Sequence, residues 1–321
     1  MRLVIDDVGS SPRDSSFIHS FIHSFIHSSL SETERSRDAS LAEATMGCAP
    51  SAPRRAPAKT KTESRESAWR ATGIVALRDS NLRELPDKLF DADGEFALKL
   101  RNVDATNNKI ERIPREIGNC GNITRLVLAS NLIESLPEEM GRLTRLKTLA
   151  LDDNRISSLP DSIGSLRALT TLSACGCALT TLPTTLSACE SLTVVKCSKN
   201  ASLASSALDA LADCERLEEI DLSSCALTVV PASVGRLKRL KTLNIENNVG
   251  VHTIPSDVFK SCEALTKLVA YGTSVRNVEY TDGYDTYVER VKMRHGKIIS
   301  GNSMIGDERR GLDYGFDHVP S

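Results

Sequence analysis

The sequence predicts an α/β solenoid, and two observations support this prediction. Asparagines recur at equal intervals, at Asn108, Asn131 and Asn154, each at the same place in a ladder of leucine and isoleucine residues. A proline closes that ladder in five successive turns of the pattern, at Pro86, Pro114, Pro137, Pro160 and Pro183. A period in the twenties with apolar residues at fixed offsets is typical of leucine-rich repeats. We therefore expect a horseshoe-shaped leucine-rich-repeat solenoid of about nine coils, with a parallel sheet on the concave side and short helical or 3-10 turns on the convex side.

The coils follow the pattern L-x-x-L-x-L-x-x-N-x-L-x-x-L-P. One coil reads Leu146, Leu149, Leu151, Asn154, Ile156, Leu159 and Pro160. The first coil starts at Val75 and the ninth spans Leu265 to Thr273. The first coil is longer than the regular interval, and the polar segment 91–95 is the expected surface insertion. The coils around Asn200 and Asn248 each hold one extra residue before the next apolar position.

A polar ladder is expected where each coil turns inward. The alternating L-x-L predicts a short strand with one buried face. The residue that follows can satisfy backbone groups that would otherwise be buried without partners. This structural ladder consists of Asn108, Asn131, Asn154, Cys177, Asn200, Cys225 and Asn248. The two cysteines match the volume of the site but are weak hydrogen-bond donors.

Composition narrows the functional classes. The net charge is −2, so the sequence shows no nucleic-acid footprint. No apolar run approaches the roughly 18 residues of a membrane-spanning helix. Four of the nine cysteines lie at the same repeat position, shortly before the leading apolar residue of a coil: Cys120, Cys189, Cys214 and Cys262. This shared position predicts that they are small buried side chains. A zinc site at Cys175 and Cys177 would need two further ligands, and no histidine is near in sequence, so we expect no metal and no cofactor. Because the cysteines read as buried structural residues and not as disulfide partners, we expect a reduced intracellular compartment.

Residues 1–45 are interpreted as an untranslated leader or a disordered extension. Residues 17–28 repeat Phe-Ile-His-Ser three times, which is what a repeated TTCA tetranucleotide encodes. A histidine-rich metal tract formed by His19, His23 and His27 is the alternative, and the serine-rich flanks argue against it.

The segment that follows predicts a lipid anchor. Met46-Gly47-Cys48-Ala49-Pro50-Ser51 matches the N-myristoylation signal, with Gly47 as the acceptor and Cys48 placed for palmitoylation. Basic residues follow within a flexible segment spanning 46–65. One myristoyl chain binds membranes weakly, and a second acyl chain or a basic patch makes the attachment durable. We therefore expect translation to begin at Met46.

The solenoid is expected to span 66–280 and to end in a capping helix at 281–296. Tyr284, Tyr287, Val288 and Val291 fall on one face of that helix and can cover the open end of the stack. The Gly-rich, polar tail at 297–321 is expected to be disordered.

These terminal segments, with the repeats between them, resemble the leucine-rich repeat-containing protein 57 family. The matching features are the Met-Gly start, the helix from Ala68 leading into Gly73, and the Gly-Tyr-Asp-x-Tyr-x-Glu-Arg segment from Gly283 to Arg290. The repeats alone also resemble Ras-group leucine-rich-repeat proteins. The resemblance implies a lipid-anchored, non-enzymatic repeat protein of poorly defined role. This chain departs from the family at Cys177, at Cys225, in the irregular coil from Asn200 to Leu211 and in its extra tail.

The concave face is the expected binding surface. Its candidate partner-binding residues are Asp104, Asp152, Lys196, Glu219, Asp221, Asn244, Glu246 and Tyr271. Paired carboxylates on an open, wet sheet lack the cleft and raised pKa that acid–base catalysis needs, so no catalytic residue is assigned. We expect a monomeric scaffold at the cytoplasmic face of a membrane, acting in intracellular signalling on a protein partner such as a small GTPase or a phosphatase. The alternative is a soluble cytosolic or nuclear adaptor or regulatory subunit without a lipid.

Overall fold

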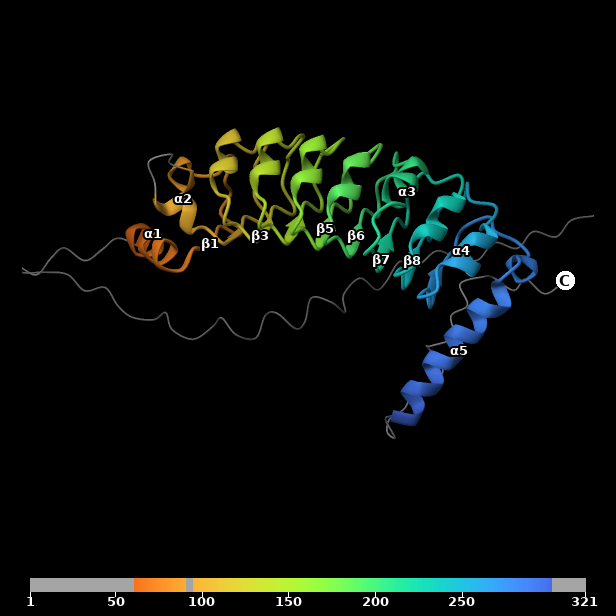
Figure 1. Ribbon diagram of the computed structural model, residues 1–321. Coiled ribbons are helices and arrows are strands. Elements are labelled where there is room, and N and C mark those ends of the chain that lie inside the picture. The colour runs from red at the N-terminus through yellow and green to blue at the C-terminus, as the bar shows by residue number, and fades with distance from the viewer. Residues whose placement is uncertain (1–60, 91–94, 302–321) are drawn as a thin grey trace, which may run out of the picture. The chain divides into compact units, whose positions relative to one another are not determined.

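The computed structural model describes residues 61–90 and 95–301 and shows the predicted leucine-rich-repeat solenoid (Figure 1). Nine parallel strands form one sheet in sequence order. The strands are β1 (Ile74–Ala76), β2 (Asn102–Asp104), β3 (Arg125–Val127), β4 (Thr148–Ala150), β5 (Thr171–Ser173), β6 (Val194–Lys196), β7 (Glu219–Asp221), β8 (Thr242–Asn244) and β9 (Lys267–Val269). The predicted fold class is therefore confirmed.

Each strand buries its middle residue, because successive side chains of a strand point to opposite faces. In register, Val75 pairs with Val103, Val103 with Leu126 and Leu126 with Leu149, and this row continues to Leu268. All of these side chains belong to a single apolar core that runs through the whole stack. The core lies between the sheet and the helical turns that Figure 1 shows along the opposite side.

Coil length decides which helix lies on that opposite side. In every coil of the regular, shortest length, the turn is a 3-10 helix: η2 (Arg115–Asn119), η3 (Glu138–Arg142), η4 (Asp161–Ser165), η5 (Thr184–Ala188) and η6 (Ala232–Arg236). The first coil, which is the longest, contains η1 (Asp87–Leu89) and α2 (Glu95–Lys99), and the two coils of intermediate length contain α3 (Ser206–Leu211) and α4 (Ser256–Ser261). An α-helix rises less per residue than a 3-10 helix, so it needs more residues to cover the same span. Of the expected loop at 91–95, residues 91–94 lie outside the described residues and Glu95 begins α2.

The asparagine ladder joins neighbouring coils. Asn131 donates from Nδ2 to the carbonyls of Ala105 (3.0 Å) and Leu128 (2.9 Å) and accepts at Oδ1 from the Ile110 N–H (3.1 Å). The Cys177 thiol donates to the Leu151 carbonyl at 3.3 Å, and the Cys225 thiol to the Cys197 carbonyl at 3.3 Å. A thiol therefore replaces one donor function of the amide and lacks its acceptor oxygen.

The N-terminal cap is longer than the sequence predicts. Helix α1 (Lys61–Thr72) includes residues 61–65, which the sequence analysis assigns to a flexible segment. Arg65 donates to the Ala76 carbonyl at 2.9 Å and stacks over Trp69, so this part of the helix contacts the first coil. The helix ends at Gly73, whose φ of 69° and close approach to the Lys99 carbonyl leave no room for a Cβ.

The C-terminal end is covered by η7 (Val278–Tyr280) and α5 (Tyr284–Gly301). Tyr284 and Tyr287 pack on the Phe259 ring, and the N–H of Leu268 donates to the Tyr287 hydroxyl at 3.1 Å. Tyr287 therefore supplies a partner to an N–H of β9, the last strand. The helix continues to Gly301, past the expected boundary at 296, and residues 302–321 lie outside the described residues.

The eight cysteines of the described residues are all free thiols. Cys120, Cys189, Cys214 and Cys262 are buried, as their equivalent positions predict. No helix in the described part of the chain is long and apolar enough to cross a bilayer.

Candidate protein-interaction face

The sheet face is the surface formed by three rows: the first and third residues of each strand and the second residue after it. Because the nine strands are in register, each row contains one side chain from every coil. All the predicted partner-binding residues lie in these rows, but they form three separate groups and not one cluster.

The first group is at the N-terminal end of the sheet face. Asp104 on β2 forms an ion pair with Arg78 at 2.5 Å and accepts a hydrogen bond from the Thr106 hydroxyl. Burial alone would raise the pKa of the Asp104 carboxyl, but the hydrogen bonds from Arg78 and Thr106 outweigh it and hold that pKa below its usual value. Asp104 is therefore occupied by local partners.

The second group is at the middle of the sheet face. The Ser173 hydroxyl donates to Asp152 Oδ1 at 2.5 Å, and the Cys175 N–H donates to the same oxygen at 2.8 Å. Asp152 thus links the coil of β4 to the coil of β5. Burial is the largest cause that raises the pKa of the Cys175 thiol, so this thiol stays protonated at neutral pH.

The third group spans β6 to β9 and is the most varied in chemistry. Lys196 pairs with Glu219 at 2.9 Å, and this hydrogen bond raises the pKa of the Lys196 ammonium against a smaller opposing effect of burial. Asp221 accepts from Ser223, and Asn244 accepts from the N–H of Glu246. The Tyr271 ring is half exposed beside them in the row after the strands. This group presents both charges and an aromatic side chain.

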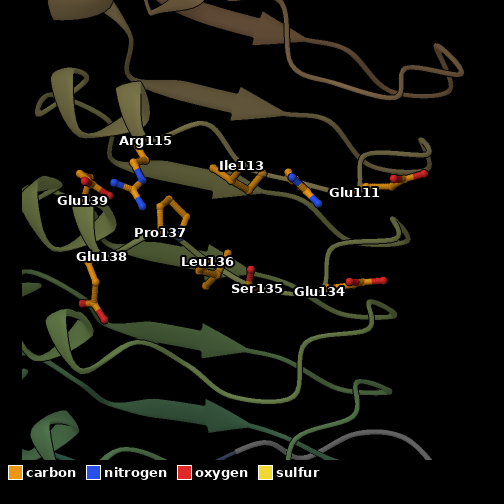
Figure 2. Close-up of a pocket in the computed structure, with 10 residues that line it drawn as sticks. Glu111, Ile113, Arg115, Glu134, Ser135, Leu136, Pro137, Glu138 and Glu139 are labelled. Atoms are coloured by element: carbon orange, nitrogen blue, oxygen red, sulfur yellow. The ribbon is translucent and has the colours of Figure 1, made fainter.

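A cleft of about 830 Å³ lies away from the sheet face, between the return segments of two neighbouring coils. Figure 2 shows Glu111 and Glu134 toward one end of this cleft and Arg115 and Glu139 toward the other. Among the described residues, no group of three or more His, Cys, Asp or Glu side chains is placed to hold a metal ion.

The repeats are what this chain shares with known proteins. A family model described as "Leucine rich repeat" matches residues 121–179. The chain contains leucine-rich repeats. It is 45% identical to the plant intracellular Ras-group-related LRR protein 7 of Oryza sativa subsp. japonica over 84 aligned residues. These residues make up 26% of this chain and 29% of that protein. It is 36% identical to protein 8 of the same group in the same organism over 66 aligned residues. These residues make up 21% of this chain and 16% of that protein.

Solved structures show the same fold. The plant peptide hormone receptor RGFR1 in complex with RGF2 superimposes with a TM-score of 0.50 at 28% identity, covering 59% of this chain and 30% of the receptor. The leucine-rich repeat domain of the type III effector XopL gives a TM-score of 0.56 at 24% identity, covering 70% of this chain and 77% of that domain. The match spans less than a third of each of the two curated relatives named above. The chain is related to the plant intracellular Ras-group-related proteins, and the closer resemblance to the protein 57 family stays a prediction.

Sequence reasoning missed several side-chain contacts of the sheet face. Ser173 and Cys175 hold Asp152, and Arg78 pairs with Asp104 across adjacent coils. The two residues of each contact are about one repeat apart in sequence, so the repeat period could have been used to predict these pairs.

Proposed function

We propose that the protein is a non-enzymatic scaffold for intracellular signalling. In this proposal it binds a protein partner on the sheet face and is held at the cytoplasmic side of a membrane by acyl groups on Gly47 and Cys48. The observation that supports the binding role is the register of nine strands, which aligns rows of side chains over eight strand spacings, roughly 38 Å in all. Such extended surfaces are what repeat solenoids use for recognition. The matched family model describes repeats and not a catalytic domain.

The group on β6 to β9 is the best candidate for the contact itself. Lys196, Glu219, Asp221, Glu246 and Tyr271 combine charge of both signs with a half-exposed aromatic ring. Aromatic side chains are enriched among the residues that dominate binding energy, and complementary charge determines which partner docks. Small GTPases and phosphatases are the partner classes to test first.

Affinity purification with quantitative mass spectrometry tests this assignment. A tagged chain carrying Asp221→Arg and Glu246→Arg should lose its partner. A control carrying Glu111→Arg and Glu134→Arg has the same change of charge on exposed return segments and should keep it. If both variants recover the same proteins as the wild-type chain, the sheet face is not the binding surface.

The membrane tether rests on the sequence, because Gly47 and Cys48 lie outside the described residues. The myristoylation signal, the adjacent cysteine and the basic residues Arg54, Arg55, Lys59 and Lys61 support it. In cells that express the chain from Met46, Gly47→Ala should move the protein from the membrane fraction to the soluble fraction, and Cys48→Ser should do so in part. Equal membrane content of wild type and Gly47→Ala would favour the soluble adaptor or regulatory subunit instead.

A further inference from the structure

The four equivalent stretches 94–104, 117–127, 140–150 and 163–173, which lead into and through β2, β3, β4 and β5, hold seven cations and two carboxylates, Glu95 and Asp104. Asp104 is already paired with Arg78. The central five are exposed, and we call them the basic flank: Arg101, Arg125, Arg142, Arg145 and Lys147. Within the described residues, none of these five forms an ion pair with a carboxylate. Their charge is therefore not neutralised locally.

Backbone stacking holds these side chains side by side. The Arg101 carbonyl accepts from the N–H groups of Thr124 (2.7 Å) and Arg125 (3.1 Å), and the Thr124 carbonyl accepts from the Lys147 N–H at 2.8 Å. Arg145 donates to the Asn122 side chain at 2.7 Å. Because neighbouring strands lie about 4.8 Å apart, Arg101, Arg125 and Lys147 lie close together at the edge where the strands begin. Arg145 lies two residues before Lys147, and Arg142 ends the turn η3.

Two exposed apolar side chains border the basic flank. Ile74 is 50% exposed, at the first position of β1, in the row that contains Arg125. Leu98 is 61% exposed, and its carbonyl accepts from Asn122, the residue that Arg145 contacts. Cations of one sign beside exposed apolar side chains are what a lipid interface binds, through headgroup attraction and shallow apolar insertion.

We propose that the basic flank docks on a bilayer surface that bears anionic lipid headgroups. This proposal rests on the proposed function and deepens it, because it states which side of the solenoid faces the membrane to which the acyl groups attach. Ile74 and Arg125 belong to the N-terminal part of the sheet face, so the group on β6 to β9 is the part left open to the protein partner.

Vesicle sedimentation of the unacylated full chain, verified by mass, tests the proposal apart from the lipid anchor. The probes are vesicles of phosphatidylcholine with and without phosphatidylserine. The flank variant carries Arg125→Gln, Arg145→Gln and Lys147→Gln. Its control carries Lys109→Gln, Arg112→Gln and Arg155→Gln, which remove two arginines and one lysine from exposed return segments. Thermal unfolding of both variants checks that they fold.

The wild-type chain should bind vesicles with phosphatidylserine, and added salt should weaken the binding. The flank variant should partition to these vesicles at least about tenfold more weakly than the wild-type chain, since each basic residue near an anionic surface adds to the binding free energy. The control should stay within about twofold of the wild-type chain. Equal binding by the two variants, equal binding to phosphatidylcholine alone, or no binding by the wild-type chain would overturn the proposal. The first outcome would make an acidic protein surface the next class to test. None of these outcomes depends on Gly47, so a failed anchor and a failed flank are distinguishable.

Discussion

The segments that lead into β4 and β8 carry an arginine and a lysine at the same two repeat positions, but only the pair before β8 is neutralised. Arg236 forms an ion pair with Asp213 at 2.8 Å, and Lys241 with Glu218 at 2.6 Å. Both carboxylates come from the coil before, at the repeat positions equivalent to the cations they meet. Stacking therefore brings equivalent positions of adjacent coils within reach of one another.

Before β4 the same geometry has a different chemistry. Arg142 and Lys147 occupy the equivalent positions, and the preceding coil offers Asn119 and Thr124 in place of the two carboxylates. The fold is the same in both places, since both coils have the regular length and a 3-10 turn. The repeat determines where side chains stand, while the charge of a flank can vary from coil to coil and so can serve a function.

The half of the solenoid from β5 onward differs in a second way, because it contains all but one of the eight described cysteines. Burial raises the pKa of Cys214 to about 12, and of Cys177, Cys189, Cys225 and Cys262 to about 11. Below the ordinary thiol pKa near 9, the folded and the unfolded chain both keep these thiols protonated, so the thiols do not weaken the fold there. Stability is lost as the pH rises from about 9 toward the raised values.

The largest expected effect is therefore selective weakening of the C-terminal half at alkaline pH. Limited subtilisin digestion at pH 8 and pH 10, with fragments read by mass spectrometry, should show that cleavage beyond residue 175 increases first. Replacing Cys189 and Cys262 with alanine should reduce this dependence on pH. Uniform cleavage across both halves at pH 10 would contradict the account.

The next effect concerns the ladder. Asn131→Ala leaves two carbonyls and the Ile110 N–H without their buried partner, which should cost about 3 kcal/mol of unfolding free energy. Cys225→Ala removes a single weak donor and should cost about 1 kcal/mol. Urea unfolding compares the two. Equal losses would mean that the amide and the thiol perform the same role.

A Cβ should have less room at Gly141 than at Gly235. A Cβ at Gly141 would lie 2.6 Å from the Ser162 carbonyl oxygen, whereas at Gly235, before α4, the nearest atom is the Asp257 Cβ at 2.9 Å. Gly141→Ala should destabilise the protein by about 2 kcal/mol, and Gly235→Ala should destabilise it less. Gly121→Ala is the control, because its Cβ would meet nothing closer than 3.8 Å. Thermal unfolding that ranks Gly235→Ala as the worst would refute the difference.

The smallest effect is a gain. An asparagine at position 177 would offer Oδ1 to the Ile156 N–H, as Asn154 does to the Ile133 N–H at 3.0 Å. Cys177→Asn should therefore stabilise the protein by about 1 kcal/mol in urea unfolding. A loss of stability would show that the surroundings of Cys177 have adapted to sulfur.

The sequence predicted the features that depend on the period. These are the nine coils, the ladder positions and the burial of equivalent cysteines, all of which follow from spacing alone. The length of α1 was missed because it depends on the contact of Arg65 with Ala76. Every coil also holds the residue before its ladder position at positive φ. Six of these nine residues are Asn, Asp or Gly, which favour that conformation, whereas Ser130, Lys199 and Ser224 give no such signal.

The candidate site was less predictable than the fold. Strand alternation placed the eight candidate residues on the sheet face. Their division into three groups came from contacts between neighbouring coils, such as Ser173 with Asp152, which depend on side-chain conformation. Recognising the basic flank required the structure, because it depends on the strand register and on which cations have ion-pair partners.

The most direct test of the account transplants the ion pairs of one region into the other. Asn119→Asp with Thr124→Glu gives Arg142 and Lys147 the partners that Arg236 and Lys241 have, without removing a cation. Binding of the unacylated chain to phosphatidylserine vesicles should then fall at least about tenfold. The reverse change, Asp213→Asn with Glu218→Thr, should strengthen that binding. Unchanged binding by the first variant would contradict the claim that an uncompensated basic flank faces the membrane.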